Sequence, residues 1–197
     1  MTRIFLAGLL GGIAMFIWSS IAHMVLPLGE TGLNEIPNEQ TVLDAMQHNI
    51  AEKSGLYIFP GLGLGPNPTR EQKNEAMKHM ADNFARRPSG ILMYNAAGSR
   101  PIDMVRWLGV EFLTEVAEAL LAVYLLSKTR LTNFGARVGF MIVAGILAAI
   151  ATNISYWNWY GFPTSYTLSY ISTQVVGFFC AGLVAAFVLR KQTFGAN

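Results

Sequence analysis

Residues 107–126 read WLGVEFLTEVAEALLAVYLL, an apolar run that carries three glutamates, Glu111, Glu115 and Glu118. An α-helix needs about 20 mostly apolar residues to cross a bilayer, and this run is about that long. At about 100° per residue, the three glutamates fall within roughly 60° of one another and form a stripe along one helix face. A charged carboxylate inside a bilayer costs at least about 2.5–3.5 kcal/mol, so the stripe must face protein, water, a cation or a proton.

Three further apolar runs lie on either side of this one, at residues 4–26, 135–155 and 167–189. Together with residues 107–127 they predict an all-α membrane bundle of four transmembrane helices. The composition agrees, because only 13% of the residues are charged, about half of the roughly 25% found in soluble domains. Arg3 would also suit the start of a signal peptide, but we interpret the first run as an anchor that the protein keeps.

Basic residues gather at three places along the chain: before the first run, between the second and third, and after the fourth. They are Arg3, then Lys128, Arg130 and Arg137, then Arg190 and Lys191. Cytoplasmic flanks of membrane helices carry an excess of Lys and Arg. We therefore expect a multi-pass protein of a bacterial inner membrane with both termini in the cytoplasm. Residues 27–106 and a short aromatic loop, residues 156–166, then face the periplasm.

The first periplasmic segment is long and varied enough to form a small α/β insertion between the first two membrane helices. We predict helices over 38–50 and 69–86, the second with a capping box between Thr69 and Gln72. Short strands are predicted over 55–60 and 90–94. Because two strands alone are marginal in water, the insertion should need the membrane surface, a partner or further strand pairing.

Several residue types that often carry chemistry have simpler explanations here. Met77, His79 and Met80 could bind copper, but His79 points away from the helix face that the two methionines share, and an amphipathic helix explains them better. A single cysteine, Cys180, excludes an internal disulfide and a cysteine-based zinc site. His48 is expected on the surface. A formal charge of +2 without a basic run argues against nucleic acid as a partner.

Polar residues of other spans fall at depths similar to the glutamate stripe. The candidate intramembrane polar cluster consists of Glu111, Glu115, Glu118, His23, Asn153 and Gln174. We expect Glu115 to approach His23, Asn153 or Gln174 rather than lipid, because an inward carboxylate gains hydrogen bonds. Glu111 should lie nearest the interface, with Arg106 to assist it, and Glu118 deepest.

Two interpretations of this cluster remain open. Either its carboxylates and His23 bind a metal or relay protons, or they hydrogen-bond to neighbouring spans and fix the packing of the helices. No histidine stands at helical spacing to any glutamate of the stripe, so we predict no metal site.

Small residues at close spacing let membrane helices approach one another. Candidates for such helix packing are Gly8, Gly12, Gly135, Gly139, Gly145 and Ala149.

The segment Ile21-Ala-His-Met-Val-Leu-Pro-Leu-Gly29, followed by Gly55-Leu-Tyr57 and by a late segment with Asn153, Trp157 and Phe162, resembles small uncharacterised bacterial four-span inner-membrane proteins. The resemblance covers much of the chain but is loose. It implies the four-span topology and no activity.

Three functions fit these features. The first is a non-catalytic accessory or structural subunit of a larger inner-membrane complex of respiratory, oxidase or photosynthetic type. The second is a small ion- or proton-coupled carrier that uses the glutamate stripe. The third is a metal- or haem-binding redox protein, in which His23 would be the axial ligand. No catalytic motif or cofactor is indicated, and the expected partners are the lipid bilayer and other membrane subunits or further copies of the chain.

Overall fold

A computed structural model describes residues 2–191, which contain seven helices and a two-stranded sheet. The chain divides into two compact units. Unit 1 comprises the residues up to Asn34 and those from Asp103 onward; unit 2 is Glu35–Ile102. Unit 1 contains α1 (Thr2–Met24), α5 (Met104–Ser127), α6 (Phe134–Tyr160) and α7 (Thr164–Val188). Unit 2 contains α2 (Glu39–Ile50), β1 (Gly55–Phe59), α3 (Arg70–Lys78), α4 (Met80–Arg86) and β2 (Gly90–Tyr94).

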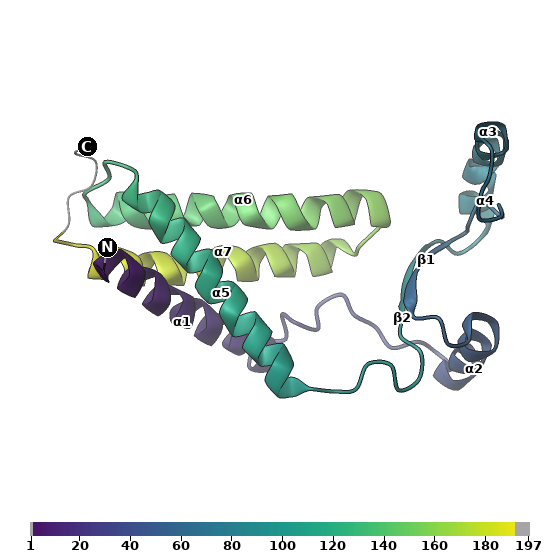
Figure 1. Cartoon of the computed structure of the whole chain (residues 1–197), viewed down its shortest axis with the longest axis horizontal. Coiled ribbons are helices and arrows are strands. Elements are labelled where there is room, and N and C mark those ends of the chain that lie inside the picture. The colour runs from purple at the N-terminus through teal and green to yellow at the C-terminus, as the bar shows by residue number, and fades with distance from the viewer. Residues whose placement is uncertain (1, 192–197) are drawn as a thin grey trace. The chain divides into compact units, whose positions relative to one another are not determined.

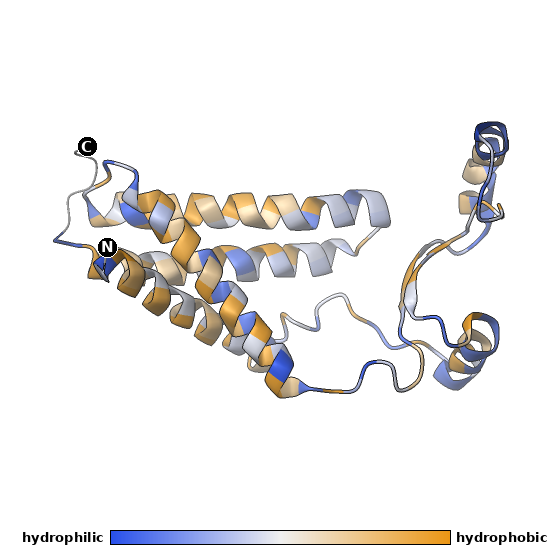
Figure 2. Cartoon of the chain, viewed as in Figure 1, coloured by the Kyte–Doolittle hydropathy of each residue, from blue (hydrophilic) through white to orange (hydrophobic). Residues whose placement is uncertain are grey.

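The predicted, largely helical architecture is confirmed in its coarse form. Three helices of the described chain, α1, α6 and α7, are long and apolar enough to cross a membrane. By composition α5 does not qualify alongside them, because its three glutamates interrupt the apolar sequence, as the hydrophilic positions along it show (Figure 2). It is nevertheless as long as the others, at 24 residues.

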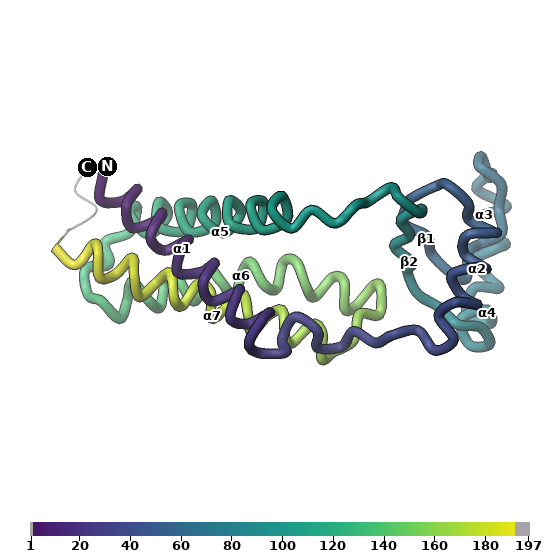
Figure 3. Tube along the Cα trace, turned by 90° about the horizontal axis from the view of Figure 1, so that it is seen from below, coloured from purple at the N-terminus to yellow at the C-terminus, as the bar shows by residue number. Residues whose placement is uncertain are grey.

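In unit 1, α1 lies between α5 and α7, and α7 lies between α1 and α6 (Figures 1 and 3). Close contacts join Gly8 to Leu120, and the contact moves four residues back along α5 as it moves four forward along α1, to Gly12 and Val116. The two helices are therefore antiparallel. A hydrogen atom in place of a side chain at both glycines is what lets the two backbones meet.

The other helix contacts follow the same antiparallel pattern. Gly11 packs against Ala181 of α7, while Gly145 of α6 packs against Phe178 of α7. By contrast, α5 makes few contacts with α6 and α7. The four helices therefore form an open row, α5–α1–α7–α6, rather than a closed four-helix bundle in which α5 and α6 would lie together along their length.

The small residues that the sequence analysis selected for helix packing differ in their surroundings. Gly8, Gly12 and Gly145 lie at helix contacts, and Ala149 is buried at 1% exposure. A Cβ added at Gly139 would have no neighbouring atom within 4 Å, and one added at Gly135 would meet only Asn133, which caps the same helix. Both lie where α6 has little packed against them, so their spacing reflects no contact between helices.

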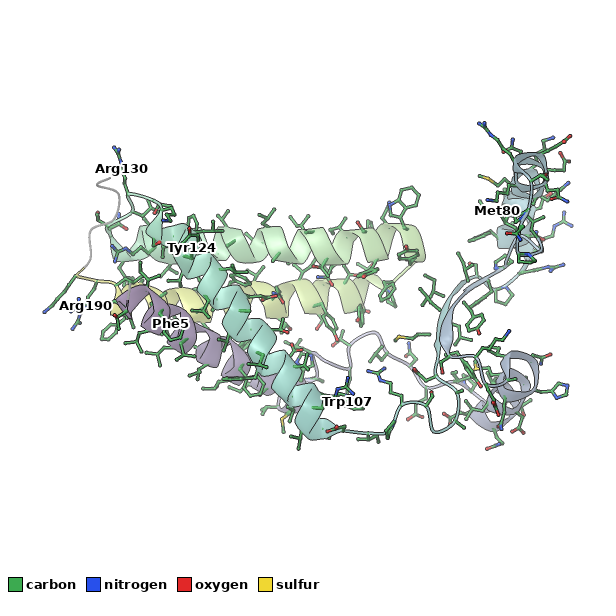
Figure 4. All side chains as sticks on the ribbon, viewed as in Figure 1. Phe5, Met80, Trp107, Tyr124, Arg130 and Arg190 are labelled. Atoms are coloured by element: carbon green, nitrogen blue, oxygen red, sulfur yellow. The ribbon has the colours of Figure 1, made fainter. Side chains whose placement is uncertain are left out.

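The hydrophobic core of unit 1 lies at the end where α1 begins, α5 turns into α6 and α7 ends (Figure 1). At that end the buried Arg137 side chain joins two segments. Its Nε donates to the Leu131 carbonyl at 2.9 Å, and its Nη1 donates to the Leu189 carbonyl. The exposed Arg130 and Arg190 lie at the same end (Figure 4). The basic segments that the sequence assigned to one side of the membrane thus share one end of unit 1.

The segment predicted as an aromatic loop over residues 156–166 is largely helical, which corrects that prediction. No glycine or proline lies between Gly145 and Gly161, so the helix continues through the aromatic residues to Tyr160. Gly161 has φ 70° and ends the helix in the left-handed conformation that glycine tolerates best. Pro163 then precedes the first residue of α7, so only a short connection remains.

Unit 2 contains a two-stranded antiparallel sheet and short helices, two of which, α3 and α4, lie between the strands in the chain. In the sheet, β1 pairs with β2, and Leu56 faces Met93. The capping box of α3 is present as predicted, with Gln72 N donating to Thr69 Oγ1 at 3.2 Å. The single helix predicted over 69–86 is divided at His79, whose N–H donates to Ala76 three residues back and tightens the turn.

Candidate functional site

The stripe of glutamates on α5 lies against α1 and α7, and each acid has a different environment. Glu115 is the buried member, with 8% of its surface exposed. Its carboxyl group makes a side-chain hydrogen bond with Ser19 of α1. Its second oxygen, Oε2, is fully buried and has no hydrogen-bond partner among the described residues. Glu115 is thus the acid for which the protein supplies least compensation.

Glu118, one turn further along α5, links that helix directly to α7. Gln174 Nε2 donates to Glu118 Oε2 at 2.9 Å. Glu118 is half-buried. The neutral amide compensates this carboxyl group and fixes α5 against α7 at one point.

Glu111 is the exposed member of the stripe. It acts electrostatically on Glu115 and Glu118, and also on the Tyr170 side chain of α7. No ion pair joins it to Arg106 in the described part of the chain, so the expected assistance from that arginine is not observed. An exposed acid and a buried acid therefore stand four residues apart on one helix face.

His23 lies at the end of α1 and contacts a different set of groups. Its Nδ1 donates to the Ser19 carbonyl at 2.8 Å, and its ring lies 6.2 Å from that of Tyr170. The chain after α1 folds back beside it, where Ser169 Oγ donates to the Leu28 carbonyl at 2.7 Å. His23 therefore borders the glutamate stripe without a hydrogen bond or ion pair to any of its carboxyl groups within residues 2–191, and it contacts both α1 and α7.

Asn153 does not join the cluster. Its amide donates to the Ala149 carbonyl of its own helix at 3.0 Å. The depth deduced for it from the sequence gave no information on its direction, and α6 is separated from α5 along most of its length because α1 and α7 intervene. The expectation that Glu115 would approach His23, Asn153 or Gln174 is therefore wrong in its named partners, since Ser19 is the one it meets.

Tyr166 and Tyr170 border the site, and the sequence analysis did not include them in the cluster. Their rings stack with centroids 4.5 Å apart on one face of α7. Tyr166, Tyr170 and Gln174 follow one another at intervals of four, so the periodicity that identified the glutamate stripe could also have identified this one. Trp18 adds a further link between helices, since its Nε1 donates to the Thr173 carbonyl at 2.9 Å.

Among the described residues, the carboxyl groups of the stripe have neither an ion-pair partner nor a set of ligands for a metal ion. Within residues 2–191, no three His, Cys, Asp or Glu side chains gather in a way that could hold a metal ion. The Met77–Met80 segment lies where α3 meets α4, and His79 there is 3.9 Å from the Glu75 carboxylate. What the site offers is two carboxyl groups with hydroxyl and amide neighbours and a third carboxyl group that is open to its surroundings.

No family model, curated protein or solved structure matches this chain.

Proposed function

We propose that the chain is a non-catalytic accessory subunit of a larger assembly in a bacterial inner membrane, of respiratory, oxidase or photosynthetic type. The observation that carries the proposal is the lack of a core in unit 2. Every residue of Glu35–Ile102 is described, and none of them is buried. A soluble domain is stabilised mainly by apolar surface removed from water, and unit 2 by itself removes little.

One face of the two-stranded sheet carries exposed apolar side chains. Leu56 and Met93 are directly opposite on one face, and Ile58 follows on the same face. Their exposed fractions are 70%, 69% and 64% respectively. A two-stranded sheet alone is only marginally stable in water. Contiguous exposed apolar groups commonly mark a surface that contacts another molecule. We take this face as the main contact with a partner subunit.

The proposal includes α5 as a fourth membrane span. A helix of 24 residues is about 36 Å long at 1.5 Å per residue, which exceeds a hydrocarbon core of about 30 Å. The antiparallel contacts of Gly8 and Gly12 run along α1, a helix that is apolar enough to span. Four spans would leave both termini and the basic residues on the cytoplasmic side, with unit 2 in the periplasm.

Native mass analysis of the chain extracted from its own membrane in mild detergent tests this function. The expected result is a species heavier than the 21.6 kDa chain that contains at least one different membrane polypeptide in fixed ratio. A lone monomer that remains folded without any partner would contradict the proposal. A complex made only of copies of this chain would also contradict the accessory role.

A pair of variants tests whether the partner binds the apolar face of the sheet. Leu56→Asn combined with Ile58→Asn should release the partner, because it makes the exposed apolar face polar without changing the strand register. Leu43→Asn is the control, since Leu43 is also an exposed leucine of unit 2, at 45%, but lies on α2. If both variants retain or both lose the partner, the apolar face of the sheet is not the contact.

The carrier and the metal- or haem-binding redox protein remain predictions. His23 is held by its own helix through Nδ1, and a second axial ligand is not evident.

A further inference from the structure

Glu115 is buried at the contact between α5 and α1 in a way that packing alone does not explain. It is 92% buried, and Oε2 has no partner in the described part of the chain. A buried ionised carboxylate is tolerated only when it is paired and hydrogen-bonded. A glutamine of nearly the same shape would meet the packing requirement at this position without a charge.

Ser19 hydrogen-bonds to the Glu115 carboxyl group, and its hydroxyl group is neutral. Its Oγ also lies 3.2 Å from the Phe16 carbonyl, to which Ser20 Oγ donates at 2.7 Å. A hydroxyl group has a single hydrogen and two acceptor lone pairs, so Ser19 can donate to an ionised Glu115 or accept from a protonated one. This neighbour therefore suits an acid that binds and releases a proton.

The charged and titratable groups that face Glu115 favour a carboxyl group that carries a proton. From its own helix, Glu111 and Glu118 both act on it, and both are acids. From α1 the contact is the neutral Ser19 hydroxyl, and His23 of that helix is turned to a backbone carbonyl. From α7, Gln174 donates to Glu118, and Glu111 acts on Tyr170. None of these described groups supplies a positive charge to an ionised Glu115.

We propose that Glu115 is a proton-binding site that exchanges its proton with the exposed Glu111 one helical turn away. In the exchange, an O–H bond on the Glu111 carboxyl group breaks and an O–H bond on the Glu115 carboxylate forms. Glu111 gains the negative charge that Glu115 loses, and no electrons are transferred. Glu111 is suited to deliver the proton because it is exposed on the same face, whereas Glu118 already accepts from Gln174. This proposal does not depend on the accessory role, which rests on unit 2.

Infrared spectroscopy of the whole chain in lipid nanodiscs tests the binding of the proton. The expected result at neutral pH is a carbonyl band of a protonated carboxylic acid that Glu115→Gln removes and Glu118→Gln retains. The absence of such a band, or its persistence in Glu115→Gln, would overturn the proposal. Ser19→Ala gives a second test that leaves the acid in place, since loss of the hydroxyl neighbour should shift the frequency of the band. An unshifted band in Ser19→Ala would also count against it.

Transfer into D2O tests the exchange with Glu111. The shift of the carbonyl band reports the replacement of the bound proton by deuterium. Glu111→Gln should retain the band but slow this shift by roughly a hundredfold, the lower range for loss of a positioned acid–base group. An unchanged rate would refute the exchange. Addition of sodium chloride, compared with choline chloride, should leave the band unaltered; loss of the band with sodium alone would identify a cation site instead.

Discussion

A methyl group added at Gly12 probes the contact between α1 and α5 on which the arrangement of the glutamate stripe depends. In Gly12→Ala, the new Cβ would lie closer to the Val116 Cα than real atoms approach. The obstacle is the backbone of α5, which cannot turn away as a flexible side chain would. One turn earlier, a Cβ at Gly8 would lie 2.8 Å from the Leu120 Cα, so the contact offers no free space to move into.

The magnitude follows from two opposing effects. Overpacking of a well-packed contact costs about 1–3 kcal/mol. Replacing glycine by alanine within a helix returns up to about 1 kcal/mol through helix propensity. We therefore expect Gly12→Ala to lower the free energy of unfolding by about 1–2 kcal/mol, which changes the ratio of folded to unfolded protein by a factor of roughly 5–30.

Gly139→Ala is the matched control, because Gly139 lies within α6 and a Cβ there has no neighbouring atom within 4 Å. It should be neutral or slightly stabilising, since only helix propensity changes. Reversible unfolding in mixed micelles, followed by tryptophan fluorescence, measures both variants. If Gly12→Ala and Gly139→Ala have the same stability, the close approach of α1 and α5 is refuted.

Three further predictions use the same unfolding assay or amide hydrogen exchange. Glu118→Gln should change stability by less than about 1 kcal/mol, because an amide can still accept from Gln174, and interhelical hydrogen bonds in membranes average about 0.6 kcal/mol; Glu118→Lys should instead block insertion or assembly, and a normal yield of it in membranes would contradict this account. Arg137→Leu should destabilise unit 1 by about 3 kcal/mol or more, since it removes hydrogen bonds from a charged donor to buried carbonyls such as that of Leu189; equal stability would show that these bonds contribute nothing. Thr69→Ala should cost about 1 kcal/mol by removing the α3 cap, seen as faster amide exchange in that helix alone, and unchanged exchange would argue against the cap.

The sequence was sufficient for features that depend on local spacing. The lengths of the apolar runs predicted the long helices, and the Thr69–Gln72 spacing predicted the cap of α3. The aromatic segment was predicted less well, because Trp and Tyr were interpreted by their preference for the interface. Trp and Tyr are also compatible with a helix, and α6 therefore continues through them until Gly161 ends it.

Features that depend on what lies opposite a residue could not be predicted. Gly8 and Gly139 each belong to a pair of glycines four residues apart, yet only Gly8 meets another helix. Gly11, Gly177 and Gly182 were not among the residues selected for packing and nevertheless lie at contacts. The spacing of small residues shows that another helix can approach closely. Only the position of the neighbouring helix shows which of these residues form the contact.

In the polar cluster, the prediction of which carboxyl group contacts Gln174 was in error by one helical turn. The stripe on α5 and its contact with Gln174 were both anticipated, but the acid bound to Gln174 is Glu118 rather than Glu115. Depth along the two parallel helices α5 and α7 was deduced to within about a turn, or about 5 Å. That error exceeds the distance over which a hydrogen bond forms, so the partners of individual carboxyl groups required the structure.

Both proposals use α5 as a membrane span, and site-directed labelling tests that claim most directly. In a chain with Cys180→Ser, a new cysteine on either side of α5 reports the location of its two ends. The account predicts that a membrane-impermeant maleimide added to intact spheroplasts labels Lys73→Cys in unit 2 and leaves Thr132→Cys, between α5 and α6, unlabelled until lysis. Labelling of both positions before lysis would contradict the account, because the two ends of α5 would then lie on the same side of the membrane.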